Sequence, residues 1–167
     1  GALESISAQS VRPLEIIVLD DASTDDSVKV VNKFAKRDSN IRLLRNDQNK
    51  GVIYTVNKLF EMASGDYIFC PAADDIILPG FFEKSLRLLA MNPKEALCSS
   101  VGRLIDIDGN DLGIRSMPII SKLPCFLSPE EVKRTLMQYG RWIDAGSVIY
   151  KRKPLLTDRK QIPELGS

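Results

Sequence analysis

Two pairs of adjacent aspartates each come directly after a hydrophobic run of the sequence: Asp20 with Asp21, and Asp74 with Asp75. If both runs are parallel strands, the pairs lie at the same edge of a sheet, where open α/β sheets bind ligands. Four carboxylates close together repel one another unless a cation or hydrogen-bond donors offset their charge. The pattern therefore predicts a site for an oxygen-binding divalent cation, Mg²⁺ or Mn²⁺.

Such a cation usually takes one or two protein carboxylates and completes its shell with phosphate oxygens and water. The pattern therefore also predicts a diphosphate ligand. Residues 46–51 form a polar stretch in which Lys50 supplies a cation and Gly51 lacks a side chain. Both features would let the chain approach a phosphorylated nucleotide, although the same composition is equally typical of a plain turn.

The 167 residues include no histidine, which excludes Ser/His/Asp triads, Cys/His dyads and histidine-based zinc sites from this segment. Cys70, Cys98 and Cys125 are widely spaced and form no Cys-x-x-Cys pair, which indicates reduced core residues rather than a zinc site or a disulfide framework. Any chemistry must therefore use carboxylates, hydroxyls, lysine or a hard metal ion.

The composition is that of a folded globular domain, with 44% hydrophobic and 27% charged residues. Lys and Arg number 23 against 22 Asp and Glu, and this balance gives no reason to expect nucleic acid as a partner. No apolar run approaches the roughly 20 residues that span a bilayer. We therefore expect a cytoplasmic domain without a membrane span, which reaches the inner face of the membrane only through parts outside this segment.

Hydrophobic periodicity predicts strands that alternate with helices. The expected strands are 15–19, 41–44, 67–70, 96–101 and 145–150. The expected helices are 52–63 and the stretches after Asp26, Pro79 and Ser128. Three strand–helix units in a row indicate an α/β fold, a three-layer and mostly parallel doubly wound sheet. Asp108 and Gly109 carry a hairpin signal, which predicts a small antiparallel addition.

Capping signals predict where several helices begin and end. Ser23 and Asp26 fit a capping box, with Asp25 and Asp26 as charges at the amino end of the following helix. Gly65 stands where a helix C-cap belongs. Ser128, followed by proline and glutamate, predicts the start of a late helix.

The segment 14–27, LEIIVLDDASTDDS, resembles the first nucleotide-binding signature of family 2 glycosyltransferases, with Ala22 in place of the usual glycine. Residues 2–10 resemble the helix end that precedes this signature in the family. Four further segments resemble later motifs of the family in their order and spacing: 49–51 (NKG), 63–68 (ASGDYI), 73–75 (ADD) and 146–154.

The resemblance implies the GT-A fold, which is Rossmann-like, and one glycosyltransferase domain over residues 1–167. Residues 1–105 would form the nucleotide-sugar-binding half, and residues 106–167 the start of the acceptor-side region. The family's opening strand and its C-terminal part have no counterpart in the sequence. We therefore expect a fragment of a longer enzyme.

Carried over position by position, the resemblance implies that Asp21 contacts the base or ribose of the nucleotide. Asp74 would contact the ribose side, and Asp75 the metal that bridges the diphosphate. Lys50 and Gly51 would lie beside the nucleotide.

The implied reaction is metal-dependent transfer of a sugar, with inversion, from a nucleotide-diphospho-sugar donor to a sugar, lipid or protein acceptor. By family habit the nucleotide is UDP, with deoxythymidine and guanosine diphosphates as alternatives. The family's catalytic base belongs to a Glu-Asp pair that does not occur here before Ser167, so the base is not identified. Asp144 is the nearest acidic residue, but it precedes the relevant strand, and Asp20 is expected to be a structural partner of its loop.

Two other classes of protein fit part of the pattern. A phosphoacceptor receiver module would use the acidic pairs together with Lys151, but it needs its acceptor aspartate after the strand 41–44, which ends in Arg45 and Asn46. A non-catalytic glycosyltransferase-like module that binds a nucleotide or a partner shares every feature except the base.

Overall fold

The computed structural model describes residues 1–114 and 118–157. The chain divides into two compact units. Unit 1 comprises Gly1–Cys98 together with the chain from Ile149 onward, and unit 2 comprises Ser99–Val148.

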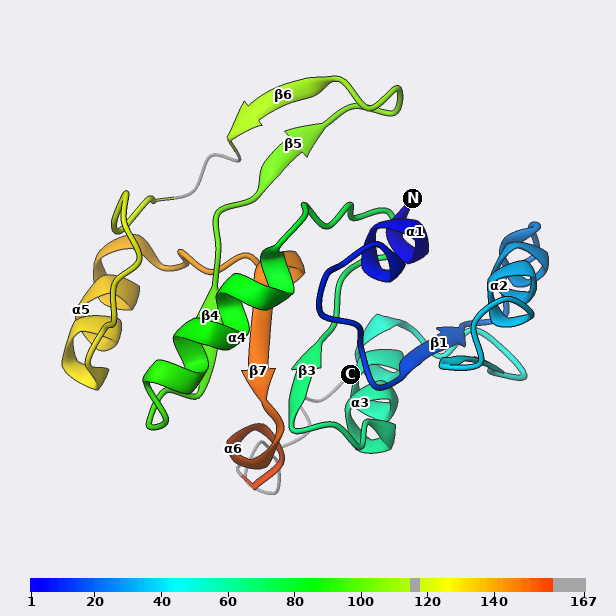
Figure 1. The fold of residues 1–167 in the computed structure, drawn as a ribbon, viewed down its shortest axis with the longest axis horizontal. Helices are drawn as coiled ribbons and strands as arrows, with labels where there is room; N and C mark the ends of the chain where they lie inside the picture. The colour runs from blue at the N-terminus through cyan, green and yellow to red at the C-terminus, as the bar shows by residue number, and fades with distance from the viewer. Residues whose placement is uncertain (115–117, 158–167) are drawn as a thin grey trace. The chain divides into compact units, whose positions relative to one another are not determined.

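Unit 1 alternates helices and strands, as the periodicity predicts (Figure 1). Its strands are β1 (Ile16–Asp20), β2 (Ile41–Arg45), β3 (Tyr67–Phe69), β4 (Leu97–Ser99) and β7 (Val148–Lys151), the last two of which cross the boundary between the units. Its helices are α1 (Ala2–Ser7), α2 (Ser27–Ala35), α3 (Val52–Met62), α4 (Phe81–Met91) and α6 (Arg152–Thr157). The predicted α/β class is therefore confirmed.

The hydrogen bonds of these strands form two separate sheets instead of the single sheet that the sequence predicts. β1 and β2 pair in parallel, with Ile16 opposite Ile41, whereas the other sheet has the order β3-β7-β4. In that sheet β7 is antiparallel to β3, with Tyr67 opposite Lys151. The prediction failed here because β7 pairs with β3 from about 80 residues further along the chain, and local periodicity carries no information on such pairings.

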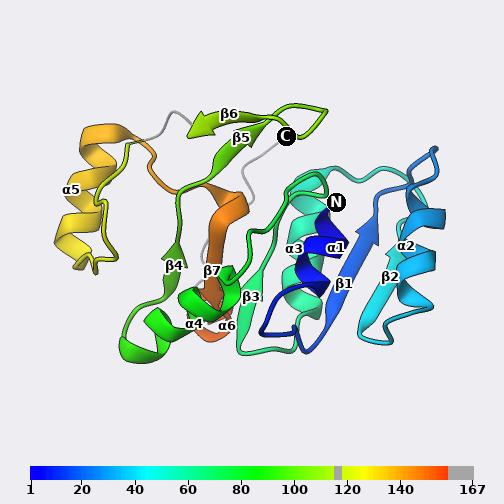
Figure 2. The ribbon, with the colours of Figure 1, turned by 45° about the horizontal axis from the view of Figure 1, so that its top comes forward.

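Side-chain bonds tie β1 to the turn that leads into β3. Glu15, just before β1, accepts hydrogen bonds from the backbone N–H and the hydroxyl of Ser64, at 2.7 and 2.6 Å. These bonds lower the pKa of Glu15, with a smaller contribution from Arg42. β1 and β3 point toward the same side in Figure 2, so the loops that follow them leave from the same end of unit 1.

The core of unit 1 joins α1, α4, β7 and the loop before α4. Its buried members are Ile6, Ile77, Phe82, Leu89 and Ile149. The rings of Phe69 and Phe82 meet edge to face, with centroids 5.4 Å apart, an arrangement that favours aromatic pairs. The core therefore connects the first helix directly to the loop after β3.

Two predicted helix ends are wrong. α2 begins at Ser27 with Asp26 as its N-cap, and Ser23 does not cap it; instead Asp25 accepts a hydrogen bond from the Ser27 N–H at 2.9 Å. α3 ends at the C-cap Ala63, so Gly65 lies beyond the cap. In both places the polar side chains of the loop are engaged in other bonds that propensity rules do not foresee.

Unit 2 contains the predicted antiparallel addition. β5 (Arg103–Ile105) and β6 (Asp111–Ile114) form a hairpin, and Gly109 adopts a φ of 85° in its turn. α5 (Pro129–Tyr139) begins with the predicted cap, because Ser128 accepts a hydrogen bond from the Glu131 N–H and the Glu131 carboxylate accepts one from the Ser128 N–H. A short 3-10 turn, Ala145–Ser147, then precedes β7, which begins three residues later than predicted.

Across the described ranges 1–114 and 118–157, no helix is both long enough and apolar enough to cross a bilayer.

Candidate functional site

The loop after β1 is organised by Asp20. Its side chain is 5% exposed, accepts hydrogen bonds from the Ser23 N–H at 3.2 and 3.3 Å, and pairs with the Arg45 guanidinium at 3.0 Å. Arg45 lies opposite Asp20 in the β1–β2 register and also donates to the Ser23 carbonyl at 2.8 Å. The expected structural role of Asp20 is thus consistent with its contacts.

Ala22 adopts a left-handed backbone conformation, with φ at +63°, unlike every other non-glycine residue that the structure describes. This conformation costs an L-residue with a Cβ free energy, and glycine avoids that cost. The backbone at position 22 therefore gives a physical reason for the glycine that family 2 signatures carry there.

Asp21 binds the loop 46–51, hereafter the nucleotide loop. Its Oδ1 accepts hydrogen bonds from Asn46 Nδ2 at 2.8 Å and from the Lys50 N–H at 2.9 Å, and its Oδ2 accepts one from the Gly51 N–H at 2.8 Å. The Asn46 bond, followed by the two backbone N–H groups, holds the pKa of Asp21 below its usual value. Asp21 is therefore charged at neutral pH and fixes the path of the loop before α3.

A carboxylate offers about four acceptor positions, so these three bonds leave one position on Oδ2. The Thr55 hydroxyl, one turn into α3, is buried and has no hydrogen-bond partner within the described structure. It lies near enough to Asp21 to lower its pKa further.

Positive charge gathers on the other side of the nucleotide loop. Lys50 Nζ pairs with Asp47 at 2.9 Å, which raises the Lys50 pKa, and Lys58 Nζ donates to Asn46 Oδ1 at 3.3 Å. Both ammonium groups lie over the ring of Tyr54, 5.3 and 5.8 Å from its centroid. The Lys50 and Lys58 ammonium groups, beside the exposed backbone of the nucleotide loop, suit a phosphorylated ligand.

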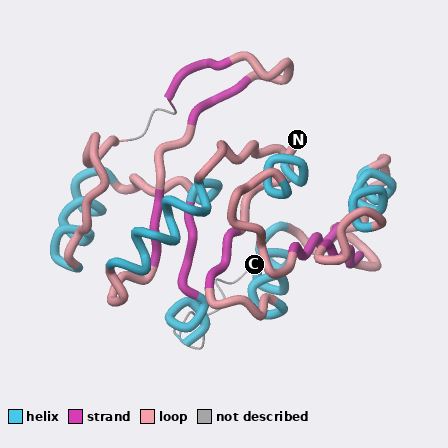
Figure 3. Tube along the Cα trace, in the orientation of Figure 1, coloured by secondary structure: helices cyan, strands magenta, loops and turns pink. Residues whose placement is uncertain are grey.

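The second acidic pair lies in residues 70–80, hereafter the acidic loop, which joins β3 to α4 without regular structure (Figure 3). Asp75 Oδ2 accepts a hydrogen bond from the Ala72 N–H at 2.8 Å, and the Asp75 N–H donates to the Ala72 carbonyl at 3.2 Å. The Asp74 side chain is exposed, and the described residues offer it no hydrogen bond or ion pair. One oxygen of Asp75 and both of Asp74 are thus open to a ligand.

The four aspartates do not form the single cluster that the sequence predicts. No group of three or more His, Cys, Asp or Glu side chains is placed to hold a metal ion in the described ranges. The physical reason is that Asp20 and Asp21 each satisfy their charge locally, through Arg45 and through the donors of the nucleotide loop. The donor set that fits Mg²⁺ or Mn²⁺ is the acidic loop alone, with one or two carboxylates.

Asp144 belongs to unit 2, where it is the N-cap of the 3-10 turn. Its backbone carbonyl accepts a hydrogen bond from the Ser147 N–H at 2.9 Å, and its carboxylate lies close to the Cα side of Gly102. Lys151 donates to the carbonyls of Pro93 and Asn92 at 2.6 and 3.4 Å, so its ammonium group anchors the end of α4. That anchoring gives no support to the receiver interpretation of Lys151.

Several residues of the site were not assigned a role from the sequence: Arg45, Asn46, Tyr54, Thr55 and Lys58. Asn46 was within the predicted loop, and Lys58 stands one turn after Tyr54 on the same helix. Nothing in their spacing, however, ties them to Asp21, because these contacts join segments that are 12 or more residues apart.

Comparison with known proteins places these features in a family. The family model described as Glycosyl transferase family 2 matches residues 1–141. EpsE of Bacillus subtilis, named as a glycosyltransferase, is 30% identical over 124 residues, which is 74% of this chain and 43% of that protein.

Two further relatives come from other organisms. The uncharacterized glycosyltransferase MJ1057 of Methanocaldococcus jannaschii is 32% identical over 66% of this chain and 39% of its own length. Glycosyltransferase GlyG of Streptococcus pneumoniae is 27% identical over 65% of this chain and 36% of its own length. The chain therefore spans less than half the length of these relatives. By the match over residues 1–141, the chain belongs to glycosyl transferase family 2.

Proposed function

We propose that this chain carries the donor-nucleotide site of an enzyme that transfers a sugar, with inversion, from a nucleotide-diphosphate donor to an acceptor hydroxyl. The preferred donor is a UDP-sugar, and the acceptor is a sugar, a lipid or a protein. The proposal concerns the whole protein, because the matched residues cover less than half of the relatives' length.

The observation that carries the proposal is the pairing, in one unit of a family 2 chain, of an organised nucleotide loop with an open acidic loop. In this site Asp21, which holds the Lys50 and Gly51 N–H groups, would contact the base or ribose of the nucleotide. A Cβ built on Gly51 would meet no atom within 4 Å, so open space lies beside this backbone. Lys50 adds a positive charge next to it.

The acidic loop would hold the divalent cation. Asp75 Oδ2 accepts the hydrogen bond from the Ala72 N–H, and its other carboxylate oxygen would bind the cation. Asp74 is exposed next to it in the sequence. A bound Mn²⁺ or Mg²⁺ would neutralise the charge that develops on the departing diphosphate. A ligand set of one or two protein carboxylates, completed by phosphate oxygens and water, is usual for Mg²⁺.

Inversion requires a carboxylate base that faces the acceptor hydroxyl. We propose that this base comes from outside the donor site of Asp21 and Asp75. Asp21 is unsuited to the role, because three hydrogen bonds hold its pKa low and stabilise its charged form.

The experiment is calorimetric titration of UDP with and without Mn²⁺ into the chain and into two variants. Asp75→Asn keeps the shape and an oxygen for the Ala72 N–H but removes the charge. Asp66→Asn is the matched control, because it removes an exposed aspartate next to the opposite end of β3.

We expect Mn²⁺ to tighten UDP binding to the wild-type chain, and Asp75→Asn to weaken the Mn²⁺-dependent binding by about tenfold, or about 1.4 kcal/mol. Asp66→Asn should bind as wild type does. Equal binding by Asp75→Asn and wild type would contradict the metal role. Binding of dTDP or GDP in place of UDP would correct the nucleotide, and binding without sugar transfer by the whole protein would favour the non-catalytic module.

A further inference from the structure

The acidic loop is held by two polar side chains at the end of the first helix. Ser5 Oγ accepts a hydrogen bond from the Ile77 N–H at 3.0 Å and donates to the Ala2 carbonyl at 2.8 Å, so the orientation of the hydroxyl is fixed. Gln9 Nε2 lies 3.1 Å from the Leu78 carbonyl and 3.4 Å from the Ile77 carbonyl. These contacts join residues about 70 positions apart in the sequence.

The Gln9 amide is buried, with 5% of the residue exposed. Its Nε2 faces the Ser5 carbonyl at 3.2 Å as well as the two loop carbonyls, so an amide rotated by 180° would bring oxygen against three oxygens. Its Oε1 has no hydrogen-bond partner among the residues that the structure describes. Apart from the Ser5 carbonyl of α1, the Gln9 side chain bonds, among the residues described, only to the acidic loop, and leaving Oε1 unpaired costs free energy.

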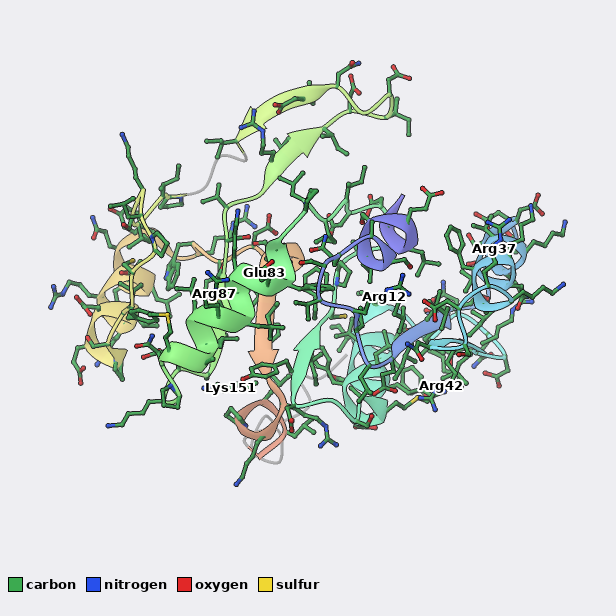
Figure 4. All side chains as sticks on the ribbon, viewed as in Figure 1. Arg12, Arg37, Arg42, Glu83, Arg87 and Lys151 are labelled. Carbon is green, nitrogen blue, oxygen red and sulfur yellow. The ribbon has the colours of Figure 1, made fainter. Side chains whose placement is uncertain are left out.

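Two neighbouring contacts reinforce the same attachment. The Ser10 hydroxyl donates to Glu83 at 3.2 Å, and Glu83 also pairs with Arg87 one turn further along α4, as their positions in Figure 4 allow. Ile6 and Ile77 are both buried in the core of unit 1. The segment Ile77–Leu78 is thus bonded through its N–H, its carbonyls and its apolar side chain.

Asp74 and Asp75 lie between two fixed points of the acidic loop. On one side, reciprocal hydrogen bonds close the turn between Ala72 and Asp75. On the other side, Ile77 is only two residues away and is bonded to Ser5. The backbone of the exposed Asp74 and the half-buried Asp75 is therefore held from the first helix on its carboxyl-terminal side.

We propose that Ser5 and Gln9 are positioning residues for the cation site, which hold Asp74 and Asp75 at the place where they meet a metal–diphosphate. This inference rests on the proposed function for the identity of the ligand. Neither residue touches the ligand itself; both act through the loop. A side chain of this kind contributes to metal affinity because it restricts the positions of the carboxylates that coordinate the metal.

The test uses the full chain with Gln9→Met and Ser5→Ala. Gln9→Met keeps the volume, removes the loop hydrogen bonds and also removes the unpaired Oε1, so it is expected to fold. Ile6→Val is the matched control, because it loosens the packing of the same helix on the same core while it leaves the hydrogen bonds from Ser5 and Gln9 to the loop in place.

The first readout is amide hydrogen exchange by NMR, which needs no ligand. Ser5→Ala and Gln9→Met should speed exchange of the Ile77 N–H by about tenfold or more, with Lys50 and Gly51 unchanged. The second readout is UDP titration: Gln9→Met should weaken Mn²⁺-dependent binding by about tenfold and leave metal-free UDP binding unchanged.

The outcomes separate this inference from the proposed function. If wild type binds no nucleotide, the proposed function fails, and exchange alone decides whether Ser5 and Gln9 hold the loop. Unchanged Ile77 exchange in both variants would overturn the inference. So would equal losses in Ile6→Val, or a loss of metal-free and metal-dependent UDP binding together.

Discussion

At the scale of single residues, the site depends on a backbone conformation that its own sequence does not favour. Ala22 adopts a φ of +63° between the aspartate pair and Ser23. The left-handed conformation raises the free energy of an alanine by about 1 kcal/mol or more, and glycine adopts it without this penalty. Position 22 is thus a point where sequence and required conformation disagree.

Ala22→Gly should therefore stabilise the chain by about 0.5–1 kcal/mol, which corresponds to a rise in melting temperature of about 2–4 °C at most. The control is Ala8→Gly at the end of α1, where φ is −84° and glycine should destabilise by about 0.5–1 kcal/mol. Thermal unfolding followed by circular dichroism measures both. A melting temperature for Ala22→Gly that falls as far as that of Ala8→Gly would show that position 22 is not strained.

For the other residues of the site, the sequence predicts their positions but not their binding partners. The aspartate pairs are visible because they follow hydrophobic runs; the structure places Asp20 and Asp21 at the end of β1 and Asp74 and Asp75 in the loop after β3. What each carboxylate binds is not visible, because Arg45 and Asn46 reach Asp20 and Asp21 through tertiary contacts. Those partners are the reason that Asp20 and Asp21 are not part of a four-carboxylate cluster.

At the scale of elements, the nucleotide loop has little structure of its own and depends on Asp21. Two of its backbone N–H groups and one side-chain amide donate to this carboxylate. Because these donors lower the Asp21 pKa in the folded chain, the charged form contributes stability above the unfolded pKa of about 3.9. That contribution is lost as the pH falls through the still lower folded pKa.

Asp21→Asn should therefore melt at a lower temperature than wild type at pH 7, and the difference should narrow as the pH falls below about 4. Melting temperatures measured from pH 7 to pH 3 test this directly. Asp66→Asn serves as control and should show no such gap at either pH. A gap for Asp21→Asn that stays constant down to pH 3 would mean that the Asp21 charge does not organise the loop.

The elements themselves were largely predictable, and their ends were less so. Period and turn signals place the helices and strands from β1 to β4, and the Ser128 cap is found as predicted. The start of α2 was missed because Asp25 bonds to the neighbouring Ser27 N–H, and the end of α3 because Ser64 bonds to the distant Glu15.

At the scale of the whole molecule, strand order was the part that sequence reasoning could not supply. β7 lies between β3 and β4, although these two follow one another in the chain. β7 pairs with β3 in the antiparallel direction, and Glu15 bonds to Ser64, which ties β1 to the turn before β3. Both interactions join segments that are distant in the sequence. Long-range pairing of this kind is decided by packing, and hydrophobic periodicity does not encode it.

The central claim at this scale is that the nucleotide loop and the acidic loop bind one and the same nucleotide-diphosphate. The most direct measurement is an NMR titration of UDP with Mg²⁺ into the ¹⁵N-labelled chain. We expect the amides of Lys50, Gly51, Asp74 and Asp75 to shift together along a single binding curve, while the Asp66 amide does not shift. Shifts confined to one of the two loops, or two curves with different affinities, would contradict it.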